Sequence, residues 1–174
     1  INYHLGFQKE AEKYASILGY NYNSSEWFKQ SYKVLNKEYK ISVITVAKNS
    51  KKFLEENILS LKNQSYRNYE HIIIDGASTD GTQKIIQKHE KDIKYWISEP
   101  DQGLYDAMNK GIKKSTGDII GILNSDDFYY KDALKIVNNY FNKNKKIDFL
   151  FGTVLKHKLM HGYYPKKINW TFGF

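Results

Sequence analysis

Hydrophobic positions along the chain predict strands and helices that alternate from residue 40 onward. Four short apolar runs, rich in β-branched residues, are typical of strands: residues 41–47, 71–75, 93–98 and the run that begins at Ile119. Residues at helical spacing, most of them apolar, lie between these runs, at Leu54, Ile58 and Leu61, at Ile85, Ile86 and His89, and at Tyr105, Met108 and Ile112. This alternation predicts an α/β fold with a mostly parallel sheet flanked by helices.

The run from Ile119 to Asp127 is the segment around which we expect the chain to be organised. Its aliphatic part predicts a strand buried on both faces, and it stops at two adjacent carboxylates, Asp126 and Asp127. Ligands of open α/β sheets bind outside the carboxyl ends of the strands. Adjacent carboxylates repel each other unless a cation lies between them, and oxygen ligands are typical of Mg²⁺ or Mn²⁺. A solvated turn in which one aspartate caps the next helix explains the same residues equally well.

Regular spacing extends to both sides of this alternating region. Residues 1–39 have the periodicity of two helices and predict an N-terminal helical extension without evident chemistry. After the paired carboxylates, residues 133–141 have helical spacing and residues 147–154 have the character of a strand. Beyond Leu159 the pattern is irregular and aromatic.

Composition and charge narrow the functional classes. The 174 residues include no cysteine, which excludes disulfide and thiolate chemistry, and no run of about 18 apolar residues that would span a membrane. The net charge is +8, and residues 128–174 hold nine lysines against two aspartates. This basic, aromatic segment is compatible with an anionic polymer or a membrane surface as partner, and also with an ordinary solvated face.

Three of the predicted strands end in acidic or amide residues that a parallel sheet brings to one edge: Asp75, the Glu99–Asp101 turn and the Asn124–Asp127 segment. Such an edge suits a nucleotide with a diphosphate. Asp75 would accept from a base or ribose, and the helix after Gly103 would direct its N-terminus at phosphate oxygens. The chain has neither the Gly-x-Gly-x-x-Gly nor the P-loop fingerprint, which argues against a dinucleotide oxidoreductase or a P-loop NTPase. Asp75 and Asp80, taken singly, are equally typical of turns.

Four motifs, in this order, resemble family 2 glycosyltransferases of the GT-A fold. They are Ile41-Ser-Val-Ile-Thr-Val-Ala47, Asp75-Gly-Ala-Ser-Thr-Asp-Gly-Thr82, the segment from Ser98 to Gly111, and Leu123-Asn-Ser-Asp-Asp127. The resemblance implies a GT-A-like (Rossmann-like) nucleotide-sugar-binding domain at residues 40–156. The helical extension at residues 1–39 would precede it, and the start of an incomplete acceptor-side region would follow at residues 157–174.

The resemblance also implies an activity and its partners. A member of this family transfers a sugar with inversion from a nucleoside diphosphate donor, often UDP-linked, with Mg²⁺ or Mn²⁺, commonly in the synthesis of bacterial surface polysaccharide. The expected acceptor is a glycan or a lipid-linked sugar, and nucleic acid is not an expected partner. We therefore expect a cytoplasmic transferase, with peripheral association at the inner face of the membrane left open.

Matching the chain to the family's motifs assigns the expected site residues. Asp127 is the expected metal ligand, and Asp126 is a second ligand that also reaches the donor sugar or ribose. Asp75 is expected at the base or ribose of the donor. The full set of expected donor-binding residues is Val46, Ala47, Asp75, Asp80, Asp101, Asn109, Gly111 and Asp126.

Three positions depart from the family's usual pattern. Gly76 stands where a second aspartate is frequent, Met108 where an arginine is frequent, and Asn124 where an aspartate is frequent. The first departure weakens the inference of uracil recognition. The last leaves the metal site one carboxylate short, although Asn124 still supplies a neutral oxygen.

The catalytic base that the family uses has no suitable position in this chain. Inverting transfer needs an Asp or Glu to remove the proton of the acceptor hydroxyl. After Asp127 only Asp132 and Asp148 remain, and neither is well placed. The family's base lies well downstream of the metal motif, so we expect it beyond Phe174. We interpret the chain, which begins at Ile1 rather than at methionine, as a fragment that binds donor and turns over poorly.

A non-catalytic module that binds a nucleotide or an anionic polymer is the alternative function. A nucleotidyltransferase is less compatible, because Lys48-Asn-Ser-Lys-Lys52 is a poor substitute for its Gly-rich phosphate loop. Binding to an anionic polymer would fall steeply with ionic strength, whereas donor binding would depend on a divalent metal.

Overall fold

The computed structural model describes residues 13, 37–144 and 146–152. The chain divides into two compact units, residues 1–143 and residues 144–174. The helices expected within residues 1–39 fall almost entirely outside the described residues, as does the acceptor-side region expected at residues 157–174. None of the helices in the described ranges is long and apolar enough to cross a membrane.

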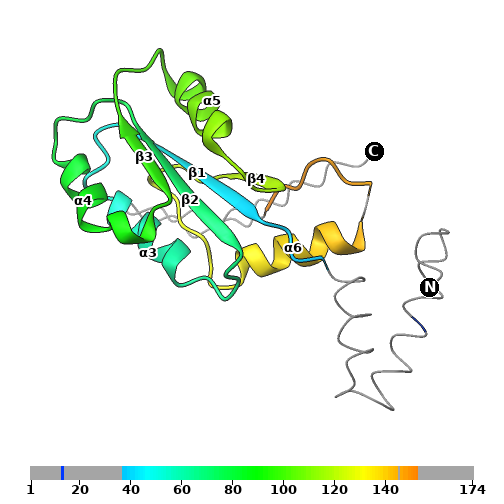
Figure 1. The fold of residues 1–174 in the computed structure, drawn as a ribbon. Helices are drawn as coiled ribbons and strands as arrows, with labels where there is room; N and C mark the ends of the chain where they lie inside the picture. The colour runs from blue at the N-terminus through cyan, green and yellow to red at the C-terminus, as the bar shows by residue number, and fades with distance from the viewer. Residues whose placement is uncertain (1–12, 14–36, 145, 153–174) are drawn as a thin grey trace, which may run out of the picture. The chain divides into compact units, whose positions relative to one another are not determined.

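The first unit is built on a parallel sheet with the strand order β3-β2-β1-β4 (Figure 1). The strands are β1 (Ile41–Ala47), β2 (Tyr69–Asp75), β3 (Tyr95–Ser98) and β4 (Ile119–Ile122). Ala47, the last residue of β1, is in register with Asp75, the last residue of β2. Asp75 is in turn in register with Ser98, the last residue of β3. The carboxyl ends of these three strands therefore form one rim, and the predicted parallel sheet is confirmed.

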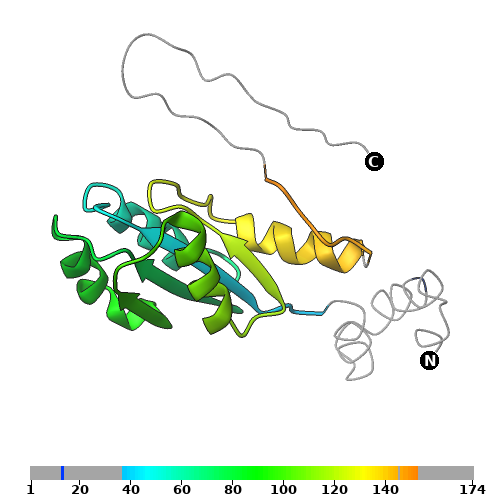
Figure 2. The same ribbon diagram turned by 90° about the horizontal axis from the view of Figure 1, so that it is seen from above.

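Helices cover both faces of the sheet (Figures 1 and 2). One face packs against α3 (Leu54–Lys62), α4 (Thr82–Lys88) and α6 (Ala133–Lys143), and the short helix η2 (Glu90–Asp92) follows α4. The other face packs against α5 (Leu104–Lys114). The apolar stripe that predicted α3 is buried, because burying the apolar face of a helix on a sheet stabilises both. Of the three residues that predicted α4, Ile86 is buried, and Ile85 and His89 are partly exposed.

The packing face of α5 differs from the predicted one. The expected stripe included Tyr105 and Ile112, but these side chains are 78% and 42% exposed, whereas Ala107 and Gly111 are buried. A Cβ at Gly111 would overlap the side chain of Ile44 on β1. Of the expected stripe only Met108 packs on the sheet, and the helix lies so close at Gly111 that a larger residue would not fit there, which a pattern of large apolar residues does not reveal.

Two predictions about strands are wrong for the described residues. The run that begins at Ile119 was expected to be buried on both faces, but Ile120 and Ile122 are 43% and 40% exposed. Within the described ranges β4 is an edge strand that pairs with β1 alone. Its exposed side chains lie on the side of the sheet that α5 covers, but α5 packs mainly against β1 and β2, so this side of β4 stays largely uncovered. Of the strand expected at residues 147–154, the described residues 147–152 form none, and their Phe149 and Phe151 are exposed.

Candidate functional site

Three loops meet at the carboxyl rim of the sheet, and the turn after β1 ties them together. The backbone N–H of Asn49 donates to Ser78 Oγ at 2.7 Å, and the Asn49 side chain accepts from the N–H of Thr79 at 3.0 Å. Ser50 Oγ lies 2.7 Å from Ser125 Oγ. These contacts connect the loop after β2 and the loop after β4 through the loop after β1, so the rim is a single hydrogen-bonded unit.

Asp75 is the buried anchor of this rim. Its side chain is fully buried and accepts from the N–H of Ser78 at 3.0 Å, from Ser78 Oγ, and from Ser98 Oγ at 2.6 Å. The carboxylate therefore joins the loop after β2 to the end of β3. A buried carboxylate needs hydrogen-bond donors to offset the loss of water, and the three donors to Asp75 meet that need and shape the surrounding loop. In the free protein its oxygens are engaged within the rim, and the donor contact expected for Asp75 stays a prediction.

Asp101 lies over Gly76, the residue that follows Asp75. A Cβ at Gly76 would overlap Oδ2 of Asp101, while Oδ1 of Asp101 accepts from the N–H of Gly103 at 2.9 Å. The absence of a side chain at Gly76 thus makes room for a carboxylate that comes from the turn after β3. A carboxylate is present beside the end of β2 after all, but position 101 supplies it instead of position 76.

Asp126 and Asp127 are exposed at the turn that follows β4. The N–H of Asp127 donates to the carbonyl of Asn124 at 3.0 Å, which closes the turn. The Asn124 side-chain amide donates to Asp127 Oδ2 at 3.3 Å. The neutral residue at position 124 therefore contacts one carboxylate of the pair directly and lowers the repulsion that a third aspartate would add.

The exposed pair fits a divalent ion that a ligand helps to bind. Among the described residues, no group of three or more His, Cys, Asp or Glu side chains is arranged to hold a metal. Two exposed carboxylates and the neighbouring amide oxygen supply part of an oxygen-ligand set, and phosphates and water commonly complete such a set for Mg²⁺. The donor chemistry of Asp126, Asp127 and Asn124 therefore suits Mg²⁺ or Mn²⁺ bound together with a diphosphate.

The remaining predicted donor residues lie in different surroundings. Val46 and Gly111 are buried in the packing between α5 and the sheet, and Asn109 is exposed in the middle of α5. Ala47 is buried at the end of β1, opposite Asp75. The structure thus brings Ala47, Asp75, Asp101, Asp126 and Asp127 to the rim.

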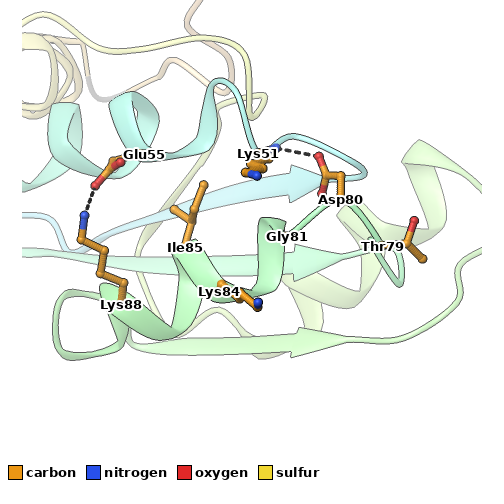
Figure 3. A pocket seen from close by; sticks show the side chains of 8 residues that line it. All are labelled: Lys51, Glu55, Thr79, Asp80, Gly81, Lys84, Ile85 and Lys88. Carbon is orange, nitrogen blue, oxygen red and sulfur yellow. Dashed lines mark hydrogen bonds and ion pairs between the residues drawn. The ribbon is translucent and has the colours of Figure 1, made fainter.

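Asp80 lines a pocket of about 430 Å³ between α3 and α4 (Figure 3). Its carboxylate accepts from the N–H of Lys51 at 3.0 Å and from the N–H and hydroxyl of Thr82 at 2.9 and 2.6 Å. The Thr82 hydroxyl, helped by these backbone donors, holds the pKa of Asp80 below its usual value. Asp80 thereby joins the loop after β1 to the start of α4, a role that turn-forming aspartates often have.

The N-terminus of α5 is occupied by the chain's own carboxylates. Asp106 accepts from the N–H of Gln102 at 3.1 Å, and Asp101 accepts from the N–H of Gly103. Lys110 binds Glu99 at 2.9 Å and Asp106 at 3.3 Å, which closes the turn. Two carboxylates at this helix end repel a phosphate, so the structure argues against the phosphate contact expected there.

Polar residues on α3 and just after its end, which the sequence analysis did not identify, hold the loop after β4. Asn57 donates to the carbonyls of Asn124 and Asp127 at 2.8 and 2.9 Å. Ser60 Oγ accepts from the N–H of Tyr129 at 3.2 Å, and Gln64 donates to the carbonyl of Tyr130 at 2.8 Å. Asn57 and Gln64 are fully buried. Asn57 lies on the same helix face as Leu54, Ile58 and Leu61, and this spacing is the signal that would have shown it to be a buried polar group.

The sheet order, the helices on both faces and the acidic rim at the carboxyl ends of the strands are those of the GT-A fold. The family model of glycosyl transferase family 2 matches residues 42–173, and the chain belongs to this family. The predicted family and fold class are thereby confirmed.

Individual relatives agree with this assignment. An uncharacterized glycosyltransferase of Mycobacterium tuberculosis is 43% identical over 88 residues, which are 50% of this chain and 34% of the relative. The Escherichia coli protein WfgD, named as a UDP-Glc:alpha-D-GlcNAc-diphosphoundecaprenol beta-1,3-glucosyltransferase, is 28% identical over 77% of this chain and 54% of its own length. Staphylococcus aureus TarS, solved with UDP-GlcNAc, superposes with a TM-score of 0.58 and 26% identity over 61% of this chain and 32% of the TarS chain. The chain spans only part of the length of each.

Proposed function

We propose that this chain carries the donor-binding part of a bacterial glycosyltransferase that takes a sugar from a UDP-linked donor, with inversion, in the synthesis of a cell-surface polysaccharide. The observation that carries the proposal is the exposed pair Asp126 and Asp127 at the carboxyl rim of a GT-A sheet. WfgD, whose name specifies a UDP-sugar donor and a lipid-linked acceptor, and TarS, solved with UDP-GlcNAc, support the donor class. The acceptor class, a glycan or a lipid-linked sugar, is proposed on the same basis.

In this proposal Asp127 and Asp126 hold a Mg²⁺ or Mn²⁺ ion together with the diphosphate of the donor. The ion neutralises the negative charge that grows on the departing nucleoside diphosphate. Asn124 orients Asp127 through its amide, and the loop after β4 presents both carboxylates to solvent. The turn of Asp101 over Gly76 forms the neighbouring wall of the rim.

We assign donor binding to the rim residues, and we assign the deprotonation of the acceptor hydroxyl to neither Asp132 nor Asp75. Asp132 Oδ1 accepts from Ser65 Oγ at 2.6 Å, so this carboxylate is engaged with the loop between α3 and β2. Asp75 is buried and bonded to two serines. An acceptor hydroxyl needs a carboxylate within hydrogen-bond reach that is free to take its proton, and neither residue meets that requirement.

Calorimetric titration of the 174-residue chain with UDP tests the proposal. We expect binding in the presence of Mn²⁺ and at least about tenfold weaker binding in EDTA, a difference of about 1.4 kcal/mol. Asp127→Asn should lose the effect of Mn²⁺. Asp132→Asn, the same substitution at a nearby aspartate, should retain it.

Two results would contradict the proposal. One is equal UDP affinity with Mn²⁺ and with EDTA in the unsubstituted chain, and the other is an undiminished Mn²⁺ effect in Asp127→Asn. Binding that falls steeply with salt and ignores the metal would instead favour the anionic-polymer module.

A further inference from the structure

A buried series of hydrogen bonds runs from β2 through β1 and α3 to the loop that carries Asp126 and Asp127. His71 Nε2 on β2 lies 2.9 Å from Thr45 Oγ1 on β1, and Thr45 Oγ1 lies 3.3 Å from Asn57 Oδ1 on α3. Asn57 Nδ2 then reaches two carbonyls of the loop. The three side chains are between 0% and 2% exposed, so they have no access to bulk water.

Hydrogen-bond chemistry fixes the direction of this series. Asn57 donates both amide protons to the carbonyls of residues 124 and 127. Its Oδ1 can therefore only accept, and the Thr45 hydroxyl donates to it. The Thr45 oxygen is then left to accept from His71, which must carry its proton on Nε2. Complete burial lowers the pKa of His71 to about 3, so the ring is neutral, as a single protonated nitrogen requires.

The last step of the series acts on the backbone of the acidic loop. The two carbonyls that Asn57 binds are three residues apart, and Asp126 lies between them in the sequence. The same turn is closed by the N–H of Asp127 on the carbonyl of Asn124. The amide of Asn57 therefore holds the backbone on both sides of Asp126, beside the contact of Ser50 with Ser125, although it contacts neither carboxylate itself.

We infer that Thr45, Asn57 and His71 are positioning residues that hold the Asp126–Asp127 loop in the geometry needed to bind a divalent ion with a nucleoside diphosphate. This inference rests on the proposed function. Without the Thr45 hydroxyl, the Asn57 oxygen and the His71 N–H each lose their partner in a buried site, and the amide of Asn57 is free to turn over. A turned amide directs its oxygen at the two loop carbonyls and repels them.

Three variants separate positioning from general stability. Thr45→Val removes the hydroxyl at constant shape, Thr45→Ser restores it, and Ile58→Val removes one buried methyl group from the neighbouring residue on α3 without touching the loop. Each chain is titrated with Mn²⁺ at a fixed concentration of UDP, and its unfolding midpoint in urea is measured in parallel. We expect Thr45→Val to weaken the Mn²⁺-dependent binding about tenfold, the smallest effect usual for a direct partner of a metal ligand, because Thr45 acts on the ligands only through Asn57. The affinity for UDP measured in EDTA should change by less than about twofold, which corresponds to under 0.5 kcal/mol.

The outcomes are distinguishable. Recovery in Thr45→Ser, together with unchanged Mn²⁺ dependence in Ile58→Val at a comparable urea midpoint, supports the inference. A Thr45→Val chain that binds Mn²⁺ and UDP as Ile58→Val does overturns it. If the unsubstituted chain shows no Mn²⁺-dependent binding, the proposed function fails instead.

A measurement on the unsubstituted protein does not depend on whether a variant folds. Nitrogen NMR of the His71 ring should show a neutral imidazole with its proton on Nε2 at pH 7. A ring protonated on Nδ1 would reverse the direction of the series and overturn the inference.

Discussion

Glu70 at the start of β2 offers a quantitative test of how the sheet is held together at the end opposite the acidic rim. The carboxylate is 5% exposed and accepts from Ser42 Oγ at 2.6 Å and from the N–H of Thr116 at 2.7 Å. Lys40 Nζ lies 2.6 Å away. Glu70 thus joins β1 and β2 to the turn that leads from α5 into β4, the strand that ends at the acidic loop.

The stability that this cluster contributes follows from the pKa of Glu70. Burial alone would raise that pKa, but the hydrogen bonds from Lys40, Ser42 and Thr116 outweigh it and lower the pKa from 4.5 to about 2. At about 1.4 kcal/mol per unit, the folded state gains about 3 kcal/mol from ionised Glu70. Because the pKa is lowered on folding, this contribution is complete above about pH 4.5 and is lost as the pH falls toward 2.

Glu70→Gln should therefore lower the free energy of unfolding at pH 7 by about 2–3 kcal/mol. The difference between this variant and the unsubstituted chain should shrink below pH 4.5 and approach zero near pH 2. Urea titrations between pH 7 and pH 3 measure it, with Glu56→Gln at an exposed position of α3 as the control. A difference between the Glu70 variant and the unsubstituted chain that stays constant over this range would refute the reasoning.

Two further predictions concern Gly111 and Gly76, where a neighbouring side chain leaves no room for a Cβ atom. Gly111→Ala should lower the free energy of unfolding by about 1–3 kcal/mol in urea titrations, because the added methyl group overlaps Ile44; an unchanged midpoint would contradict the packing of α5 described above. Gly76→Ala should likewise destabilise the chain through overlap with Asp101, and Asp101→Ala in the same chain should recover most of the loss. Independent, additive effects in this double-mutant cycle would show that the two residues are not in contact.

The parallel sheet and its order of elements were predictable from local patterns. The β-branched run at residues 41–47 matches β1 residue for residue, and the apolar stripe of α3 and Ile86 of α4 are buried. These segments obey the rule that an apolar face is buried against a neighbouring layer. The rule fails for α5, where close approach selects Ala107 and Gly111, and for β4, where an apolar run lies at the edge of the described sheet.

The position of the candidate site was predictable from the sequence, but the hydrogen bonds within it were not. The acidic and amide residues at strand ends do gather at one rim, because parallel strands end on the same side. Contacts between distant segments decide whether a carboxylate faces solvent or accepts hydrogen bonds from groups within the protein. Asp75 binds Ser98, and Asn57 binds the carbonyl of Asp127, 70 residues further along the chain. Sequence spacing contains no direct record of such pairs.

The most direct test of the central claim is a titration of the protein with Mn²⁺ at fixed UDP, followed by the relaxation of water protons. The claim is that the exposed carboxylates after β4 bind a nucleoside diphosphate through a divalent ion. Relaxation should be enhanced in the unsubstituted chain and in Asp132→Asn, where Mn²⁺ tumbles with the protein, and the enhancement should be lost in Asp127→Asn. No enhancement in the unsubstituted chain, or equal enhancement in Asp127→Asn, would contradict the claim.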